Sequence, residues 1–283
     1  MRNPVGSHVR VGKGLVAGAL ATATEANLET IQVFVGNPRG WALSDGDPAA
    51  DEAFRAASGD LGIRTYVHAP YLVNLGSPTA ATYERSVASV AHNLLRATRM
   101  GAEGVVVHTG SCVDDGEVAR ALAQVRAGLL PVLDALGDTG PMLLLEPTAG
   151  QGRSLCAGVE DLGPYLDQLD HHPRVGICLD TCHVFAAGAP LDEAGGATRT
   201  LDLLDEVAGP GRLRLVHAND SKDPRGSLRD RHERIGDGHI GDDAFVELFA
   251  HPATEGVPFV AETPGSGDPT GTCVARLAKL RDR

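Results

Sequence analysis

The sequence predicts an α/β protein with the (β/α)8 TIM-barrel fold, built as a single domain over residues 1–283. Short apolar runs of strand length recur along the chain, helix-like segments separate them, and six runs end directly at a histidine or an acidic residue. These six residues are 34 to 45 positions apart, as a repeated strand–loop–helix–loop unit requires. Active sites of such barrels lie at the carboxyl ends of the strands, so six polar side chains would share one rim. They are His68, His108, Glu146, Asp180, His217 and Glu262.

The remaining elements follow from apolar periodicity. Strands are expected within 6–14 and at 31–35, 65–67, 105–107, 142–145, 175–179, 213–216 and 259–261. Helices are expected over 15–28, from 77 to Gly101, and over 118–133, 192–207, 244–249 and 274–280. For the second helix, Ser77 is expected at the N-cap, Pro78 at the first helical position and Gly101 at the end.

Composition restricts the class of protein. The chain is 42% hydrophobic and 22% charged, which is ordinary for a soluble domain. No leader-like segment and no apolar run of about 18 residues is present, so we expect a cytoplasmic protein without a membrane partner. The five cysteines are an odd number, which favours free thiols. The net charge of −12 argues against a polyanionic partner only weakly, since bound dications would change the charge at the cleft.

Three further side chains extend the set of possible ligands. His183 stands three residues after Asp180, and a helical turn there would let the two serve neighbouring metals. Asp230 and His232 alternate in an extended segment, so both could complete a set with His183. The nine candidates are five histidines and four carboxylates, a donor set that suits zinc, with manganese as the alternative. We expect surface or core roles for the other six histidines, which are 8, 92, 171, 172, 239 and 251.

Several segments resemble the signature segments of endonuclease IV, the zinc-dependent apurinic/apyrimidinic (AP) endonuclease family 2. They are Gly176 to His183, His217 to Lys222, Gly226-Ser227, Asp230-Arg231-His232, and the loops 71–76 and 148–152. The similarity runs from about Gly6 to Glu262. The sequence departs from the family pattern at Thr109, where proline is usual, and at Pro147, where asparagine is usual. Because proline has no N–H group, we expect altered geometry around Glu146.

The resemblance implies three zinc ions and a DNA substrate. One ion would be held by His68, His108 and Glu146, a second by Glu146, Asp180, His217 and Glu262, and a third by His183, Asp230 and His232. Glu146, shared by two ions, and Glu262 are the expected catalytic residues. Arg39, Tyr71 and Leu72 would fill the gap in the duplex when an abasic sugar is flipped out.

The implied activity is DNA repair by a monomer. We expect phosphodiester hydrolysis 5′ to abasic sites in double-stranded DNA, leaving a 3′-hydroxyl and a 5′-deoxyribose phosphate, together with trimming of blocked 3′ ends. One alternative is a xylose-isomerase-like sugar isomerase or epimerase with a single divalent metal, for which Glu146, Asp180, His217 and Glu262 alone would suffice. Another is a barrel that binds lesions and keeps its metals without turnover.

Overall fold

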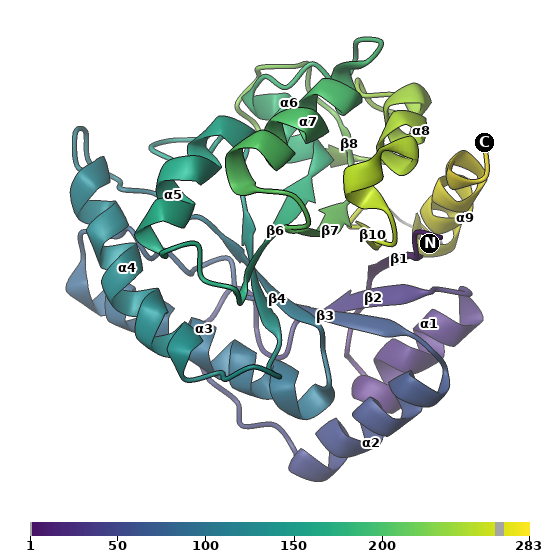
Figure 1. Ribbon diagram of the computed structural model, residues 1–283. Helices are drawn as coiled ribbons and strands as arrows, with labels where there is room; N and C mark the ends of the chain where they lie inside the picture. Colours follow the sequence, from purple (N-terminus) through teal and green to yellow (C-terminus); the bar gives the residue numbers. More distant parts are fainter. Residues whose placement is uncertain (1, 264–268) are drawn as a thin grey trace.

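The structure, a computed structural model, describes residues 2–263 and 269–283. Within these residues eight parallel strands close into a barrel, in the order β1-β10-β7-β6-β5-β4-β3-β2. The barrel strands are β1 (Val5–His8), β2 (Thr30–Val33), β3 (Arg64–His68), β4 (Gly104–His108), β5 (Met142–Glu146), β6 (Val175–Asp180), β7 (Leu213–His217) and β10 (Phe259–Ala261). Helices surround the strands (Figure 1), so the predicted single-domain TIM barrel is confirmed.

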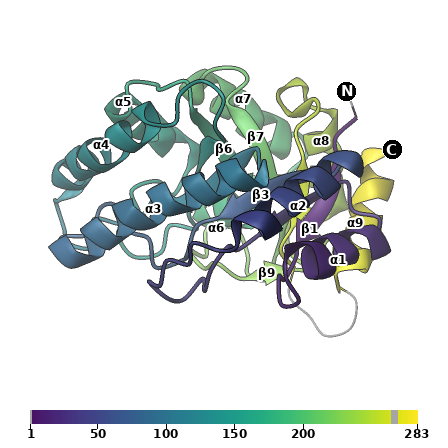
Figure 2. The same ribbon diagram turned by 90° about the horizontal axis from the view of Figure 1, so that it is seen from below.

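The helical ring contains more elements than the apolar periodicity indicated. The helices are η1 (Leu15–Leu20), α1 (Ala21–Glu25), α2 (Pro48–Asp60), α3 (Ala80–Met100), α4 (Val118–Asp134), η2 (Val159–Asp161), α5 (Leu162–Gln168), α6 (Thr181–Ala187), α7 (Gly196–Ala208), α8 (Asp242–Ala250), η3 (Pro252–Thr254) and α9 (Pro269–Arg281). In both views the two chain ends lie side by side, where β1 meets α9 (Figures 1 and 2).

Two predicted helix starts were wrong. Helix α3 begins at Ala80 with Thr79 at the N-cap, and the Ser77 hydroxyl instead accepts a hydrogen bond from the Thr79 amide. The first strand stops at His8. Helix α7 starts only at Gly196, since the preceding residues form turns. The predicted end of α3 is confirmed, because Gly101 adopts a left-handed φ of 68° that a side chain would strain.

A single layer of apolar side chains inside the barrel supports the rim. Its members lie on six successive strands of the sheet and are fully or almost fully buried: Tyr66, Val106, Leu144, Cys178, Leu215 and Val260. Side chains two positions apart on a strand point to the same face. The residue two positions further along is in every case one of the six strand-end residues named from the sequence. The packed layer therefore aims all six into the barrel mouth.

A larger apolar cluster fills the space between the strands and the helices, with Phe54, Leu94, Leu129, Leu166 and Phe245 among its fully buried members. Its burial makes the barrel a rigid frame for the side chains at the mouth. No helix in the described part of the chain is both long and apolar enough to cross a membrane. All five cysteines are free and buried, as the sequence predicted.

Candidate metal centre

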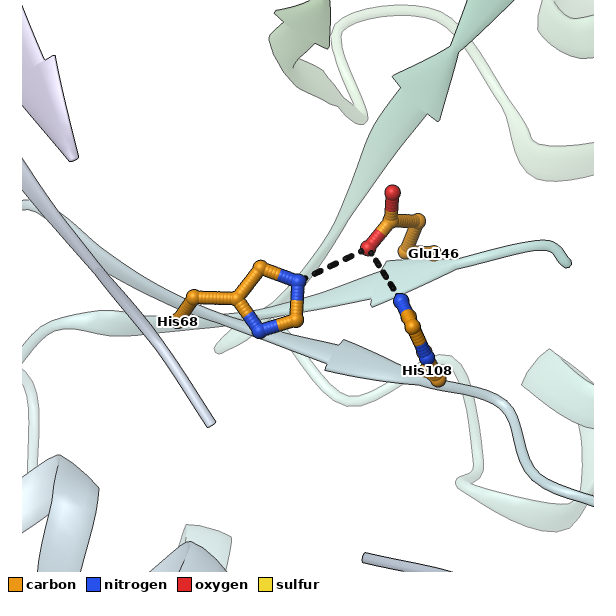
Figure 3. Close-up of side chains that lie close together, drawn as sticks. All are labelled: His68, His108 and Glu146. Atoms are coloured by element: carbon orange, nitrogen blue, oxygen red, sulfur yellow. Dashed lines mark hydrogen bonds and ion pairs between the residues drawn. The ribbon is translucent and has the colours of Figure 1, made fainter. Parts of the chain in front are cut away.

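Two histidines converge on one carboxylate oxygen at the ends of β3, β4 and β5. The Nε2 atoms of His68 and His108 each lie 3.3 Å from Oε2 of Glu146, whose side chain is 1% exposed (Figure 3). Nδ1 of His68 lies 2.7 Å from the carbonyl oxygen of Ala69, which can only accept, so Nδ1 carries the proton. The Nε2 lone pair of His68 is thereby directed at the group, as metal ligation requires.

A second group shares Glu146 and uses its other oxygen. Nδ1 of His217 lies 2.8 Å from Oε1 of Glu146, 3.3 Å from Oε2 of Glu262 and 3.9 Å from Oδ2 of Asp180. The four residues offer ligand atoms that all lie within 4.8 Å of one another. Because its two oxygens face different groups, Glu146 has the geometry of a bridging carboxylate.

The third group is assembled by a helix start. Oδ1 of Asp180 accepts a hydrogen bond of 2.9 Å from the backbone amide of His183, so Asp180 is the N-cap of α6. This cap turns the imidazole of His183 toward the loop between β8 (Asp220–Ser221) and β9 (His232–Glu233), two strands that form a short hairpin. Oδ1 of Asp230 lies 3.3 Å from Nε2 of His183 and 3.1 Å from Nε2 of His232.

The departure at Pro147 leaves the useful backbone atom in place. Nδ1 of His183 donates a 3.0 Å hydrogen bond to the carbonyl of Pro147, and a proline keeps that acceptor. Thr109 is buried, and its backbone amide donates to the carbonyl of Glu146 at 3.1 Å. Thr109 and Pro147 therefore fit the observed packing. The fold accommodates both residues without the altered geometry that we expected around Glu146.

The charges of the three donor groups favour binding of a cation. Burial opposes protonation of His183 and His232, but Asp180 and Asp230 outweigh it and raise the pKa of His183 to about 10. The same two carboxylates raise the pKa of His232 to about 9. For Glu262, burial opposes ionisation, yet His217 and His68 lower its pKa to about 2. The carboxylates are thus held ionised, and the rim attracts cations.

The residues expected to bind DNA border the same rim. Tyr71 is 51% exposed and Leu72 is 37% exposed, and the backbone amide of Tyr71 donates to the carbonyl of Pro38, next to Arg39. Arg39 and the tyrosine therefore stand on adjoining loops although 32 positions separate them in the sequence. A cavity of about 300 Å³ opens beside the donor groups, lined by His68, Tyr71, His108, His183, Asp230, His232 and Glu262.

Sequence reasoning missed several side chains that contact the groups. His8, expected to be a surface or core residue, is half-buried beside the site, with Nδ1 3.7 Å from Oε1 of Glu262. Gln32 contacts both His8 and Glu262. Asn219 donates to Oδ2 of Asp180 at 2.7 Å and accepts from the amide of Glu262 at 2.8 Å. The alternation of strand residues could have indicated Gln32, since an inward glutamine in a barrel strand requires polar partners.

The two cysteines beside Asp180 are close to the donor atoms. The Sγ atoms of Cys178 and Cys182 each lie within 4.8 Å of two of the ligand atoms described above. Burial raises the pKa of the Cys178 thiol to about 12, so this thiol stays protonated at neutral pH. Cys178 belongs to the interior apolar layer, in agreement with the packing role expected from the sequence.

Comparisons with known proteins agree with this architecture. A family described as "Xylose isomerase-like TIM barrel" matches residues 20–282. The chain is 57% identical to "Probable endonuclease 4" of Streptomyces coelicolor over 99% of its own length and 96% of that protein. Endonuclease IV from Thermus thermophilus is 34% identical, with a TM-score of 0.83 and coverage of 99% of both chains.

A more distant solved structure shares the fold alone. A D-tagatose 3-epimerase-like protein superposes with a TM-score of 0.72 at 18% identity, covering 98% of both chains. The barrel itself is thus common to proteins with different names, and only the relatives at higher identity separate them. From the extent of that identity along the whole chain, we conclude that this protein belongs to the endonuclease 4 family of xylose isomerase-like TIM barrels.

Proposed function

We propose that this protein is a zinc-dependent AP endonuclease that cleaves double-stranded DNA on the 5′ side of abasic sites, leaving a 3′-hydroxyl and a 5′-deoxyribose phosphate. The same site would also trim blocked 3′ ends. The observation that carries the proposal is the convergence of nine nitrogen and oxygen donors into three groups around one cavity. The names of the relatives, endonuclease 4 and endonuclease IV, support a DNA substrate.

The donor groups fit metal ions. Nε2 of His183 and Nε2 of His232 are buried and converge on one oxygen, Oδ1 of Asp230, at 3.3 and 3.1 Å, without a well-formed hydrogen bond to it. A cation between them and Asp230 would satisfy both. Nitrogen donors outnumber carboxylates, which favours zinc over harder ions, with manganese as a partial substitute. We propose three zinc ions per chain, with the ligand sets inferred from the sequence.

The chemistry follows from the charge and position of these side chains. Bound dications would lower the pKa of water and neutralise negative charge on the phosphate and the leaving oxygen. Glu146 and Glu262, which we propose as the catalytic residues, are held ionised; Glu262 lines the cavity, and Glu146 is buried among the donors. Glu146 joins two groups through its separate oxygens, which fixes their spacing.

Substrate selection would come from the rim loops. A cavity of about 300 Å³ lies at the lower end of the usual range for ligand pockets, so it suits a sugar without its base. A missing base also lowers the cost of flipping the sugar out of the duplex. The exposed Tyr71 and Leu72, together with Arg39, would occupy the space that the sugar leaves, and the charge of Arg39 would also favour the nearby phosphates.

A one-metal sugar isomerase remains the second candidate, because epimerase-like proteins share the fold. Such an enzyme would use Glu146, Asp180, His217 and Glu262, but it has no use for His183, Asp230 and His232. These three are held together by the N-cap of α6 and by a hairpin outside the barrel, and the buried Nε2 atoms of both histidines converge on Asp230. The third group therefore favours the endonuclease.

The proposal also covers the setting in which the protein works. Residues 1–283 would act as one AP endonuclease domain, and the protein would act as a monomer. The five free, buried cysteines agree with a reducing compartment, and we propose the cytoplasm.

The decisive experiment uses an end-labelled duplex with one synthetic abasic site. We expect a single nick at that site, none in the intact duplex, loss of nicking with a zinc chelator and recovery when zinc is returned. A DNA polymerase should extend the product directly, because cleavage on the 5′ side leaves a 3′-hydroxyl. If no metal-dependent nick forms, or if the product cannot be extended, the proposed reaction is wrong. Interconversion of a ketose or aldose would instead support the isomerase.

A further inference from the structure

Gln32, near the end of β2, is fully buried and contacts three polar side chains at the barrel mouth. Its Nε2 donates to Oε1 of Glu262 at 2.6 Å and lies 3.1 Å from Nδ1 of His8. Its Oε1 lies 2.8 Å from Nε2 of His217. All three contacts have hydrogen-bond length and use both amide hydrogens and the amide oxygen, so the amide has one preferred position.

The chemistry of the partners decides how this amide is oriented. The carboxylate oxygens of Glu262 accept hydrogen bonds, so the amide nitrogen of Gln32 must face Oε1 of Glu262, 2.6 Å away. The amide oxygen then faces His217, and Nε2 of His217 must carry a proton to donate to it. The remaining nitrogen of His217, Nδ1, is therefore the one directed at Glu146 and Glu262.

His217 therefore directs Nδ1 at its donor group, whereas two neighbouring histidines direct Nε2 at theirs. His68 and His183 donate from Nδ1 to backbone carbonyl oxygens and direct Nε2 at their groups. For these two the partner is main chain and is independent of side-chain identity. For His217 the partner is the side chain of Gln32, which can be replaced.

We propose that Gln32 is a positioning residue for the group formed by Glu146, Asp180, His217 and Glu262. It fixes the tautomer of His217 and the orientation of Glu262, two of the four donors. In the described part of the chain Gln32 has no hydrogen bond to His183, Asp230 or His232, so its influence should be selective. This inference rests on the proposed function, because it assumes that the four-donor group binds a metal.

The test replaces Gln32 by methionine, which has a similar length but no amide. Purified protein is loaded with zinc and dialysed against increasing concentrations of a chromophoric zinc chelator. The zinc that remains bound per chain is then measured. We expect three zinc ions in the unchanged protein. In Gln32→Met one of them should be bound roughly 10–100-fold more weakly, as is usual when a ligand loses its orienting partner, while the other two are retained.

A second variant and a control separate positioning from general stability. Gln32→Leu should show the same selective loss. Gln168→Met, a change of the same chemistry at the end of α5, should leave all three ions in place. Thermal unfolding of each metal-free protein measures any purely structural effect. A lower melting temperature with an unchanged metal profile would overturn the proposal.

The two possible failures are distinguishable. Three zinc ions in the unchanged protein and in both Gln32 variants, with affinities within about twofold, would overturn the role of Gln32 alone. Fewer than three ions in the unchanged protein after zinc loading would overturn the proposed trinuclear site, and this inference with it. Equal weakening of all three ions would contradict the selective action argued from the contacts.

Discussion

Replacing Arg96 by methionine should destabilise the protein strongly and loosen a loop proposed to contact DNA. Arg96 on α3 and Asp51 on α2 form a paired hydrogen-bonded ion pair, Nε to Oδ2 at 2.9 Å and Nη2 to Oδ1 at 2.9 Å. The side chains are only 6% and 1% exposed. The third guanidinium nitrogen, Nη1, donates to the carbonyl of Ser44 at 2.8 Å.

The expected magnitude follows from the burial. Removing one partner of a buried ion pair leaves the other charge without compensation and costs about 3–5 kcal/mol. Arg96→Met should therefore lower the free energy of unfolding by about that amount, measured from urea denaturation midpoints at constant m value. The double variant Arg96→Met/Asp51→Leu should regain much of the loss, because two apolar side chains of suitable size tolerate the same buried site.

The same change should affect DNA binding through the loop after β2. That loop carries Arg39 and ends at the N-cap of α2, and Ser44 within it is held by Arg96 and also by His92, whose Nε2 lies 2.9 Å from its carbonyl. At a temperature where the variant stays folded, KM for the abasic duplex should rise more than kcat falls. A loss of stability below about 1 kcal/mol, or a double variant no more stable than the single one, would refute the reasoning.

Three further changes probe the rim. His183→Ala removes one donor of the third group, so we expect one zinc ion fewer per chain. The incision rate should fall at least about 100-fold, which is comparable to losing one contact that stabilises charge in the transition state. Three zinc ions per chain in this variant would contradict the assignment. Arg39→Ala should weaken duplex binding and reduce the salt dependence by about one counterion, leaving single-turnover cleavage at saturation nearly unchanged. Asp220 is fully buried and accepts hydrogen bonds from the amides of Ser221, Gly236, Gly238 and Ile240. Asp220→Asn should cost about 1–3 kcal/mol in urea unfolding, because the new amide group faces donors; an unchanged midpoint would show that the loop rearranges freely.

The barrel was predictable because its strands carry a local signal. A fully buried parallel strand such as Val105–Val107 reads as a continuous apolar run, and a polar residue directly after it marks the rim. Helix α2 was missed because its residues are mostly small, polar or charged, and only Asp51, Phe54 and Ser58 are buried. The start of α3 was misplaced by two residues, since Ser77, Pro78 and Thr79 offer competing caps and packing chooses among them.

The polar partners of the rim were not predictable in the same way. Gln32 lies 230 and 185 positions from its partners Glu262 and His217, and Asn219 lies 39 and 43 positions from its partners Asp180 and Glu262. An amide side chain carries no sign of its partners, and only closure of the barrel, which pairs β1 with β10, brings the end of β2 near Glu262 and His217. His8 was set aside for the same reason, because its environment is created by distant strands.

The sequence by itself determined the strand repeat, the nine candidate donors and the family, since each depends on residue identity and spacing along the chain. Only the tertiary structure decided which nitrogen each histidine presents, which oxygen of Glu146 faces which group, and that the loops of Arg39 and Tyr71 adjoin. The physical reason is that hydrogen bonds and ionic contacts act over a few ångströms. Which groups come within that range is fixed when the barrel closes.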